Sequence, residues 1–177
     1  MKNTVTDIAA AVLACAIAFC LVYARTDSAL ALTCAITFGT TAYHFCMRLL
    51  VGLFFNRVMN NRADYTKKWY QCSDRETRLY EKLGVKRWKN KLPTYNPDLF
   101  DRRKHSWDEI AQAMCQAELV HETIVVLSFV PVLFSIWLGS FWVFLITSFI
   151  GAAVDLAFVV MQRYNRPRIL RLIGRKP

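Results

Sequence analysis

The chain has 177 residues, of which 55% are hydrophobic, and it carries a formal net charge of +10 at pH 7. Its mean hydropathy of +0.23 is higher than an ordinary soluble domain of this size has. This composition excludes a typical soluble globular protein and favours a chain that crosses a membrane.

Four apolar stretches are long enough to span a hydrocarbon core of about 30 Å, which takes roughly 17 to 25 apolar residues per helix. They cover residues 8–24, 29–55, 123–138 and 141–161. None has the alternation of a barrel strand, and a chain in lipid must satisfy its backbone internally, so we interpret them as helices. The sequence therefore predicts an all-α polytopic membrane protein with four transmembrane helices in a single membrane domain, 1–177.

The basic residues are concentrated in two segments. Of 23 Lys and Arg residues, 14 lie in 57–104 and six lie in 163–176. Positive loops stay in the cytoplasm, which places the central segment 56–112, the tail 162–177 and both termini there. This topology, with some attraction to anionic head groups or phosphates, explains the charge without nucleic acid, and membrane lipids are the expected partners.

The central segment carries helix signals at both ends. Aromatic and aliphatic residues are mixed with charged ones between residues 65 and 83, as in an amphipathic helix on the membrane interface, and Gly84 is a plausible stop. Ser106 and Glu109 have the spacing of a capping box, which predicts a helix that begins near Trp107. That helix should continue into the third span until Pro131 kinks it.

Ionisable and polar residues inside membrane helices are costly, so each is a functional candidate. They are Tyr43, His44, Arg48, Glu118, His121, Glu122 and Asp155. With a rise of about 1.5 Å per residue, all of them fall in the inner parts of their helices. We therefore expect an active site at the cytoplasmic side of the membrane.

Glu118 and His121 lie three residues apart, on one face of a helix. The carboxylate could orient the imidazole as a general base for a hydroxyl nucleophile, or the two could form a structural ion pair. A Glu-x-x-His metal site is a third interpretation, but a di-iron site needs a second copy of the motif. No metal site is predicted, and the six cysteines have no paired spacing.

Two further sets of residues are open to both a functional and a structural interpretation. His44 and Arg48 could be a second catalytic or anion-binding pair, or a polar contact between helices, and Asp155 could pair with either. The run QRYNRPR, residues 162–168, has the donors of a phosphate or carboxylate clamp. Trp88 and the lysines around it could bind head-group phosphates or only anchor the chain.

Four motifs together resemble the glycosyl-4,4'-diaponeurosporenoate acyltransferase family over about 85–176. They are KRWKNK at 86–91, FDRR at 100–103, AELVH at 117–121 and QRYNRPR at 162–168. Members are small bacterial membrane proteins that transfer a fatty acyl group to the sugar hydroxyl of a glycosylated carotenoid. The residues carried over by position are Trp88, Lys89, Glu118, His121, Arg163, Tyr164, Asn165, Arg166 and Arg168.

The resemblance implies an O-acyltransferase at the inner leaflet of the bacterial cell membrane. We expect His121, oriented by Glu118 and accompanied by His44, to activate the acceptor hydroxyl of a glycolipid or glycosylated isoprenoid. The arginines of 163–168, with Tyr164, Asn165, Trp88, Lys89 and Arg48, should bind an acyl-CoA or acyl-carrier-protein donor, with no permanently bound cofactor. The alternatives are a lipid oxidoreductase or methyltransferase with a nucleotide cofactor, and a non-catalytic lipid-binding protein.

Overall fold

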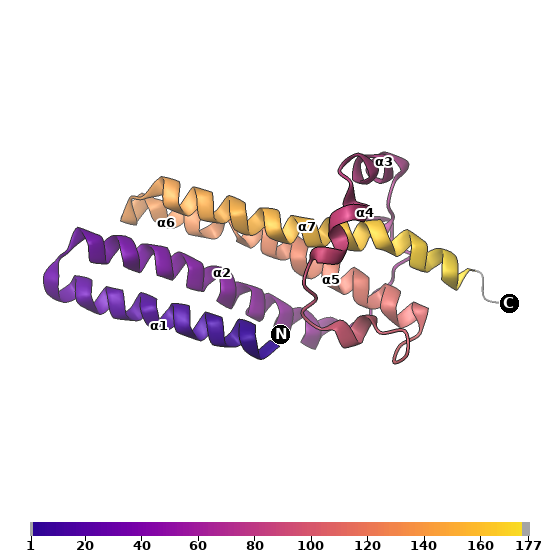
Figure 1. The fold of residues 1–177 in the computed structure, drawn as a ribbon, viewed down its shortest axis with the longest axis horizontal. Helices are drawn as coiled ribbons and strands as arrows, with labels where there is room; N and C mark the ends of the chain where they lie inside the picture. The colour runs from indigo at the N-terminus through magenta and orange to yellow at the C-terminus, as the bar shows by residue number, and fades with distance from the viewer. Residues whose placement is uncertain (1, 175–177) are drawn as a thin grey trace. The chain divides into compact units, whose positions relative to one another are not determined.

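The computed structural model describes residues 2–174, which are 82% helical and contain no strand (Figure 1). Within this range, four helical segments are long and apolar enough to cross a membrane. They are Thr4–Thr26, Ala29–Met59, Trp107–Leu138 and Phe141–Ile173. The prediction of an all-α polytopic membrane fold with four spans is confirmed.

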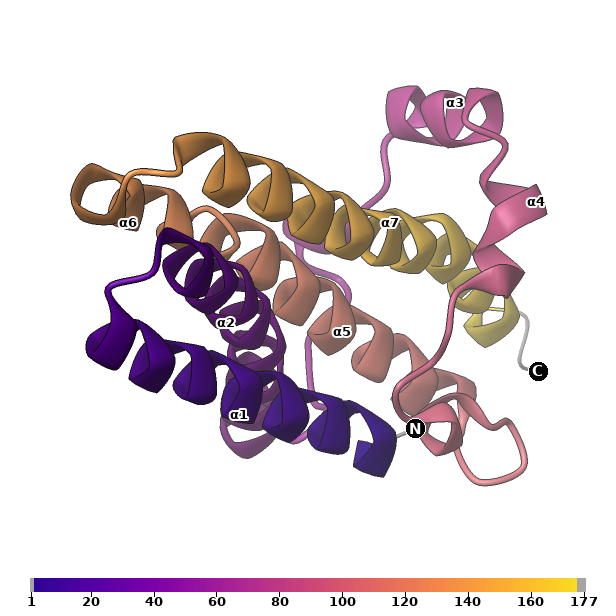
Figure 2. The ribbon, with the colours of Figure 1, turned by 60° about the vertical axis from the view of Figure 1, so that its left-hand side comes forward.

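The first of two compact units comprises Met1–Gly52 and Ile124–Ala153. It contains α1 (Lys2–Thr26), most of α2 (Ala29–Met59), α6 (Val130–Leu138) and the start of α7 (Phe141–Ile173). Figures 1 and 2 show α1 beside α2 and α6 beside α7, each pair joined by a tight turn. Gly139 reverses the chain between α6 and α7 with a φ of 65°, a conformation that glycine adopts without steric cost.

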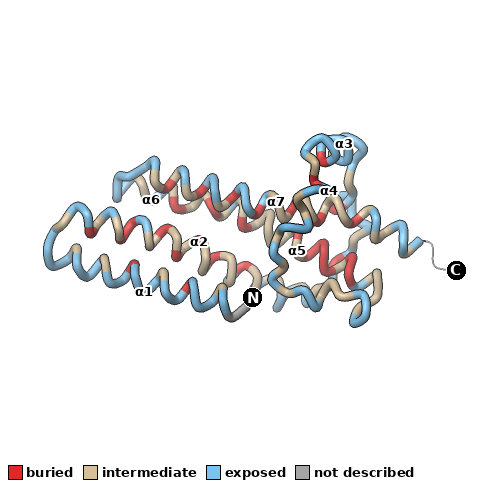
Figure 3. Tube along the Cα trace, viewed as in Figure 1, coloured by how far each residue is buried: buried red, intermediate tan, exposed pale blue. Residues whose placement is uncertain are grey.

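The surface of the first unit suits a lipid environment. Leu13, Ile17 and Leu21 on α1 are 44%, 55% and 60% exposed, and most of α1 is exposed in Figure 3. On α2, the hydroxyls of Thr37 and Thr40 donate to carbonyls one turn earlier, at 2.8 and 2.7 Å. A helix in a bilayer needs apolar side chains on its lipid-facing surface. It also needs its polar groups hydrogen-bonded within the protein, and α2 meets this need at both threonines.

The third span is interrupted, as Pro131 predicted. Two residues separate the end of α5 (Trp107–Leu127) from the start of α6 at Val130. Proline has no N–H to donate, so it is tolerated in a first turn but breaks a helix interior. Pro131 lies in the first turn of α6, so the expected kink appears as a break between two helices.

The second unit comprises Leu53–Thr123 and Val154–Pro177. It contains the end of α2, α3 (Asp74–Lys82), α4 (Val85–Trp88), most of α5 and the rest of α7, with short 3-10 turns at Lys68–Tyr70, Lys89–Lys91 and Pro97–Phe100. Tyr70 and Cys115 are part of its core, against which Leu119 packs. Buried residues of this unit lie along α5 and α7 in Figure 3.

Helix α5 begins where the capping box predicted. The backbone N–H of Ser106 donates to Glu109 at 2.7 Å, and the N–H of Glu109 donates to the Ser106 hydroxyl at 3.2 Å. These two bonds satisfy amides that a first turn otherwise leaves open. The predicted start near Trp107 is confirmed.

The predicted interfacial helix over 65–83 is wrong in its first half. A second capping box, formed by Ser73 and Glu76, makes α3 begin only at Asp74. Before it the chain is irregular except for one 3-10 turn. The stop at Gly84 is confirmed, because this residue takes a φ of 63° between α3 and α4.

The basic segment after the predicted fourth span is helical as far as Ile173. The predicted span 141–161 lies within α7, which continues to Ile173 with Pro167 inside it. Met1 and residues 175–177, the end of the predicted basic tail, lie outside the described residues. Arginines 163, 166 and 168 therefore project from one continuous helix, and their spacing decides which neighbours each can reach.

Candidate active site

A histidine and an aspartate from two helices of the second unit form a dyad. Nδ1 of His121, on α5, lies 2.8 Å from Oδ1 of Asp155, on α7. The imidazole also stacks on Phe158, with ring centroids 4.6 Å apart and planes 11° apart. Two independent contacts thus fix the orientation of the ring.

The two partners of the dyad differ in exposure. The side chain of Asp155 is 2% exposed, whereas that of His121 is 23% exposed. An imidazole that donates its Nδ1 proton to a carboxylate presents an unprotonated Nε2 as an acceptor. The arrangement therefore suits His121 to take a proton from a substrate, with Asp155 stabilising the imidazolium that forms.

Glu118 does not take the role expected for it beside His121. It is completely buried, and both of its oxygens pair with guanidinium groups from α7. Arg163 lies 2.5 Å from Oε1, and Arg166 bonds Oε2. The expected orientation of His121 by Glu118 is therefore corrected to orientation by Asp155. Within residues 4–174, no group of three His, Cys, Asp or Glu side chains could hold a metal ion.

Arg163 and Arg166 brace an irregular segment of the same unit. Arg163 donates to the backbone carbonyls of Trp69 at 3.0 Å and Gln71 at 3.2 Å. Arg166 donates from Nε to the carbonyl of Tyr70 at 2.9 Å and is fully buried. Arginine has five N–H donors, and in both residues these donors bond to backbone carbonyls and carboxylates of the protein itself. Both residues thus differ from the open phosphate clamp expected from their spacing.

Glu76 completes a four-member network with Glu118, Arg163 and Arg166. Its Oε1 accepts from Nε of Arg163 at 2.9 Å. Partial burial would raise the pKa of Glu76, but hydrogen bonds from Ser73 and the positive Arg163 hold it below its usual value. The network therefore joins two carboxylates to two guanidinium groups and holds α3 to α7.

A basic pocket of about 490 Å³ lies elsewhere in the second unit. Its lining residues are Glu81, Lys82, Gly84, Lys86, Arg87, Tyr164 and Arg168. Arg168 lies 4.5 Å from the centroid of the Tyr164 ring and donates to its hydroxyl at 2.8 Å. Of the three clamp arginines, Arg168 thus lines an open pocket.

Lys89 and Trp88 do not line this pocket, but each contacts a residue in or next to its lining. Nζ of Lys89 donates to Asn165 at 2.5 Å and lies 5.4 Å from the Tyr164 ring centroid. Partial burial, followed by repulsion from Arg168 and Lys86, lowers the pKa of Lys89. The indole of Trp88 donates to the carbonyl of Leu83 at 3.2 Å, so it braces the turn between α3 and α4.

His44 and Arg48 lie in the first unit and make backbone contacts there. Arg48 donates to the carbonyl of His44 at 2.9 Å and to that of Gly151 at 3.1 Å. His44 is buried, and a Cβ on Gly151 would come within 3.2 Å of its ring. Glycine at 151 makes this close approach possible. The catalytic role of His44 and the ligand-binding role of Arg48 stay predictions.

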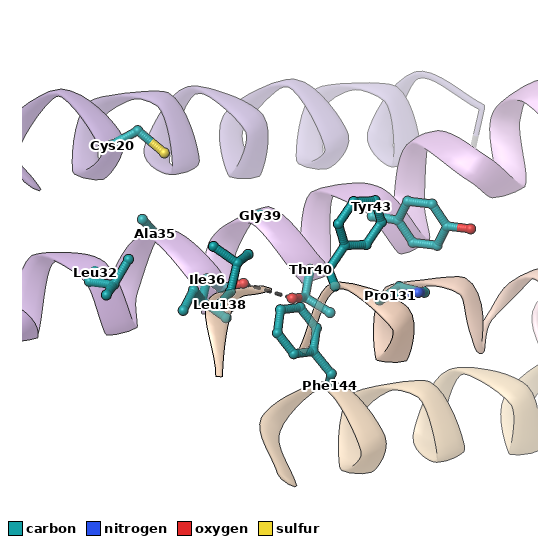
Figure 4. Close-up of a pocket in the computed structure, with 11 residues that line it drawn as sticks. Cys20, Leu32, Ala35, Ile36, Gly39, Thr40, Tyr43, Pro131, Leu138 and Phe144 are labelled. Atoms are coloured by element: carbon teal, nitrogen blue, oxygen red, sulfur yellow. Dashed lines mark hydrogen bonds between the residues drawn. The ribbon is translucent and has the colours of Figure 1, made fainter. Parts of the chain in front are cut away.

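The first unit also contains an apolar pocket of about 280 Å³ (Figure 4). Its lining residues are Cys20, Leu32, Ala35, Ile36, Gly39, Thr40, Tyr43, Pro131, Phe134, Leu138 and Phe144. The hydroxyl of Thr40 is bonded to the carbonyl of Ile36 and so offers no free donor to the pocket. The lining suits a hydrocarbon chain.

Comparison with known proteins identifies the family. The family model of the glycosyl-4,4'-diaponeurosporenoate acyltransferases matches residues 66–175 of this sequence, which is more than half of the chain. The chain belongs to this family. The enzyme is therefore an acyltransferase, of a family that acts in carotenoid biosynthesis. No curated protein and no solved structure gives a significant match.

The matched range contains the His121 and Asp155 dyad, the four-member network and the basic pocket, whereas His44 and Arg48 lie outside it. Family membership favours acyl transfer over the oxidoreductase, methyltransferase and non-catalytic alternatives. Sequence reasoning missed that Asp155 is the partner of His121. The available signal was the high cost of a carboxylate in an apolar helix, which identified Asp155 as important but not its contact.

Proposed function

We propose that the enzyme transfers a fatty acyl group from a thioester donor to a sugar hydroxyl of a glycosylated 4,4'-diaponeurosporenoate, with His121 as general base. The observation that supports this proposal best is the 2.8 Å contact between Nδ1 of His121 and the buried Asp155. Acyl transfer to a hydroxyl needs a base, because an alcohol is a weak nucleophile until its proton is removed.

The reaction proceeds in two proton transfers. Nε2 of His121 takes the proton of the acceptor hydroxyl while the oxygen attacks the thioester carbonyl carbon. The carbon–sulfur bond then breaks, and the leaving thiolate takes the proton back from the imidazolium. Asp155 stabilises the imidazolium between these steps. The products are the ester and the free thiol, and His121 returns to its starting state.

The donor is an acyl-CoA or an acyl carrier protein, used as a substrate and not as a permanently bound cofactor. Such thioesters are made in the cytoplasm, which puts the dyad at the cytoplasmic leaflet of the bacterial cell membrane. The concentration of basic residues in 57–104 and 163–176 supports this side, because positive loops stay in the cytoplasm. Both termini are then cytoplasmic.

The hydrophobic substrates need an apolar environment. The pocket of the first unit has about 280 Å³ and an almost wholly apolar lining, which supports a role in holding a hydrocarbon chain. Membrane lipids surround the exposed apolar side chains of α1, such as Leu21. The acceptor reaches the enzyme from the lipid phase.

Replacement of His121 tests the proposal. Loss of a general base typically slows a reaction by about 10² to 10⁴-fold, so His121→Ala should nearly abolish acyl transfer. The assay measures acylated product by chromatography, in membranes with matched amounts of folded enzyme and added donor and acceptor. His105→Ala, in a loop of the same unit, is the matched control and should retain activity. Full activity of His121→Ala would refute the base assignment.

A further inference from the structure

The basic pocket of the second unit gathers positive charge without neutralising it. Four of its lining residues, Lys82, Lys86, Arg87 and Arg168, are cationic, and only Glu81 is acidic. Within residues 4–174, no ion pair involves any of the four cations. Arg168 donates to a hydroxyl, that of Tyr164, and not to a carboxylate.

The fold holds these charges together against their repulsion. Gly84, with a φ of 63°, turns the chain sharply between α3 and α4, so that cations from both helices line one pocket with residues of α7. The Trp88 indole stabilises the same turn. Like charges held close together raise the free energy of an empty site, and a bound anion relieves that cost.

The residue types point to phosphate. The planar Arg fork pairs with two phosphate oxygens, and Lys adds a point charge that phosphates bind well. Lys89 lies 5.4 Å from the ring of the lining residue Tyr164, and burial, Arg168 and Lys86 lower its pKa, so a bound polyanion would raise that pKa again. The volume of about 490 Å³ falls within the range of small-molecule sites.

We propose that this pocket binds the phosphate groups of a coenzyme A donor. The proposal rests on the thioester donor of the proposed function and assigns it a site. It keeps Lys86, adds Lys82 and Arg87 to the binding residues and leaves Arg163 and Arg166 out, because the network with Glu118 occupies them. The pocket is thus the donor site, separate from the buried arginines.

Binding of free coenzyme A to the full-length enzyme in detergent, measured by titration calorimetry, tests this site. The double variant Lys86→Gln, Arg87→Gln removes two charges from the pocket. A hydrogen bond to a charged group is worth enough that its loss weakens binding about tenfold or more, so we expect at least that change in Kd. Arg75→Gln, an exposed arginine of α3 outside the pocket, is the matched control and should bind normally.

Two further measurements separate the possible anions. Coenzyme A without its 3'-phosphate should bind more weakly to the unmodified enzyme and lose less in the double variant. Vesicles of phosphatidylglycerol test the head-group source of the same chemistry. Unchanged coenzyme A affinity in a double variant with a normal melting temperature would overturn the proposal. Loss of vesicle binding alone, with coenzyme A binding intact, would overturn it too.

The outcome is independent of the base assignment. His121→Ala should bind coenzyme A as the unmodified enzyme does, because His121 does not line the pocket. If His121→Ala still transfers acyl groups, the general base is wrong and the binding data keep their meaning. If His121→Ala is inactive and the double variant binds coenzyme A normally, only the donor site is wrong.

Discussion

Replacing Asp155 with Asn tests the dyad with the least change in shape. The substitution keeps the size of the side chain and removes its charge, at an oxygen that lies 2.8 Å from Nδ1 and is screened from solvent. A hydrogen bond to a charged group contributes about 1.5–3 kcal/mol. Since about 1.4 kcal/mol corresponds to a tenfold change in rate, Asp155→Asn should slow acyl transfer about 10- to 150-fold.

The assay for this variant separates chemistry from binding. Initial rates at saturating donor should fall, whereas KM for the donor should stay the same, because Asp155 does not line the basic pocket. Asp74→Asn, at an exposed position on α3, is the control for loss of an aspartate. If Asp155→Asn works at the normal rate while His121→Ala is inactive, the carboxylate has no part in proton transfer and the reasoning is refuted.

Three further predictions concern the structure around the site. Glu118→Gln leaves Arg166 buried with a weakened partner, so the free energy of unfolding should fall by about 3–5 kcal/mol, and an unchanged melting temperature would contradict this. Because Glu76 has a depressed pKa in the folded state, its contribution to stability is complete above its ordinary value of 4.5 and disappears as the pH falls through the folded pKa. The difference in melting temperature between the unmodified enzyme and Glu76→Gln should therefore shrink below about pH 4.5. Gly151→Ala should displace the His44 ring and cost about 1–3 kcal/mol, measured by denaturation.

Local signals predicted the elements of the fold because they depend on neighbours in sequence. The length of apolar runs identified all four spans, and the reciprocal bonds of Ser106 and Glu109 located the start of α5. Gly84 ended α3 as expected, because few other residues adopt a φ of 63°. The predicted interfacial helix was too long because the amphipathic pattern starts near residue 65, whereas the capping box at Ser73 makes the observed helix start at Asp74.

The contacts of the site depended on packing and could not be predicted in the same way. Spacing of three residues places Glu118 and His121 on one helix face, but it does not show that guanidinium groups from α7 take both carboxylate oxygens. Asp155 lies 34 residues from His121, and no local pattern links them. The spacing of Arg163 and Arg166 predicted an open phosphate clamp, because the carbonyls that accept their hydrogen bonds come from a segment distant in sequence.

The hydrogen bonds from Arg163 and Arg166 to residues 69–71 determine which sequence changes this segment can accept. The two arginines hold backbone carbonyls, and every residue type supplies a carbonyl. Substitution at an exposed position such as Gln71 therefore leaves these bonds available. Insertion or deletion of one residue would shift every carbonyl out of register, so the segment tolerates variation at its exposed side chains but not in its length.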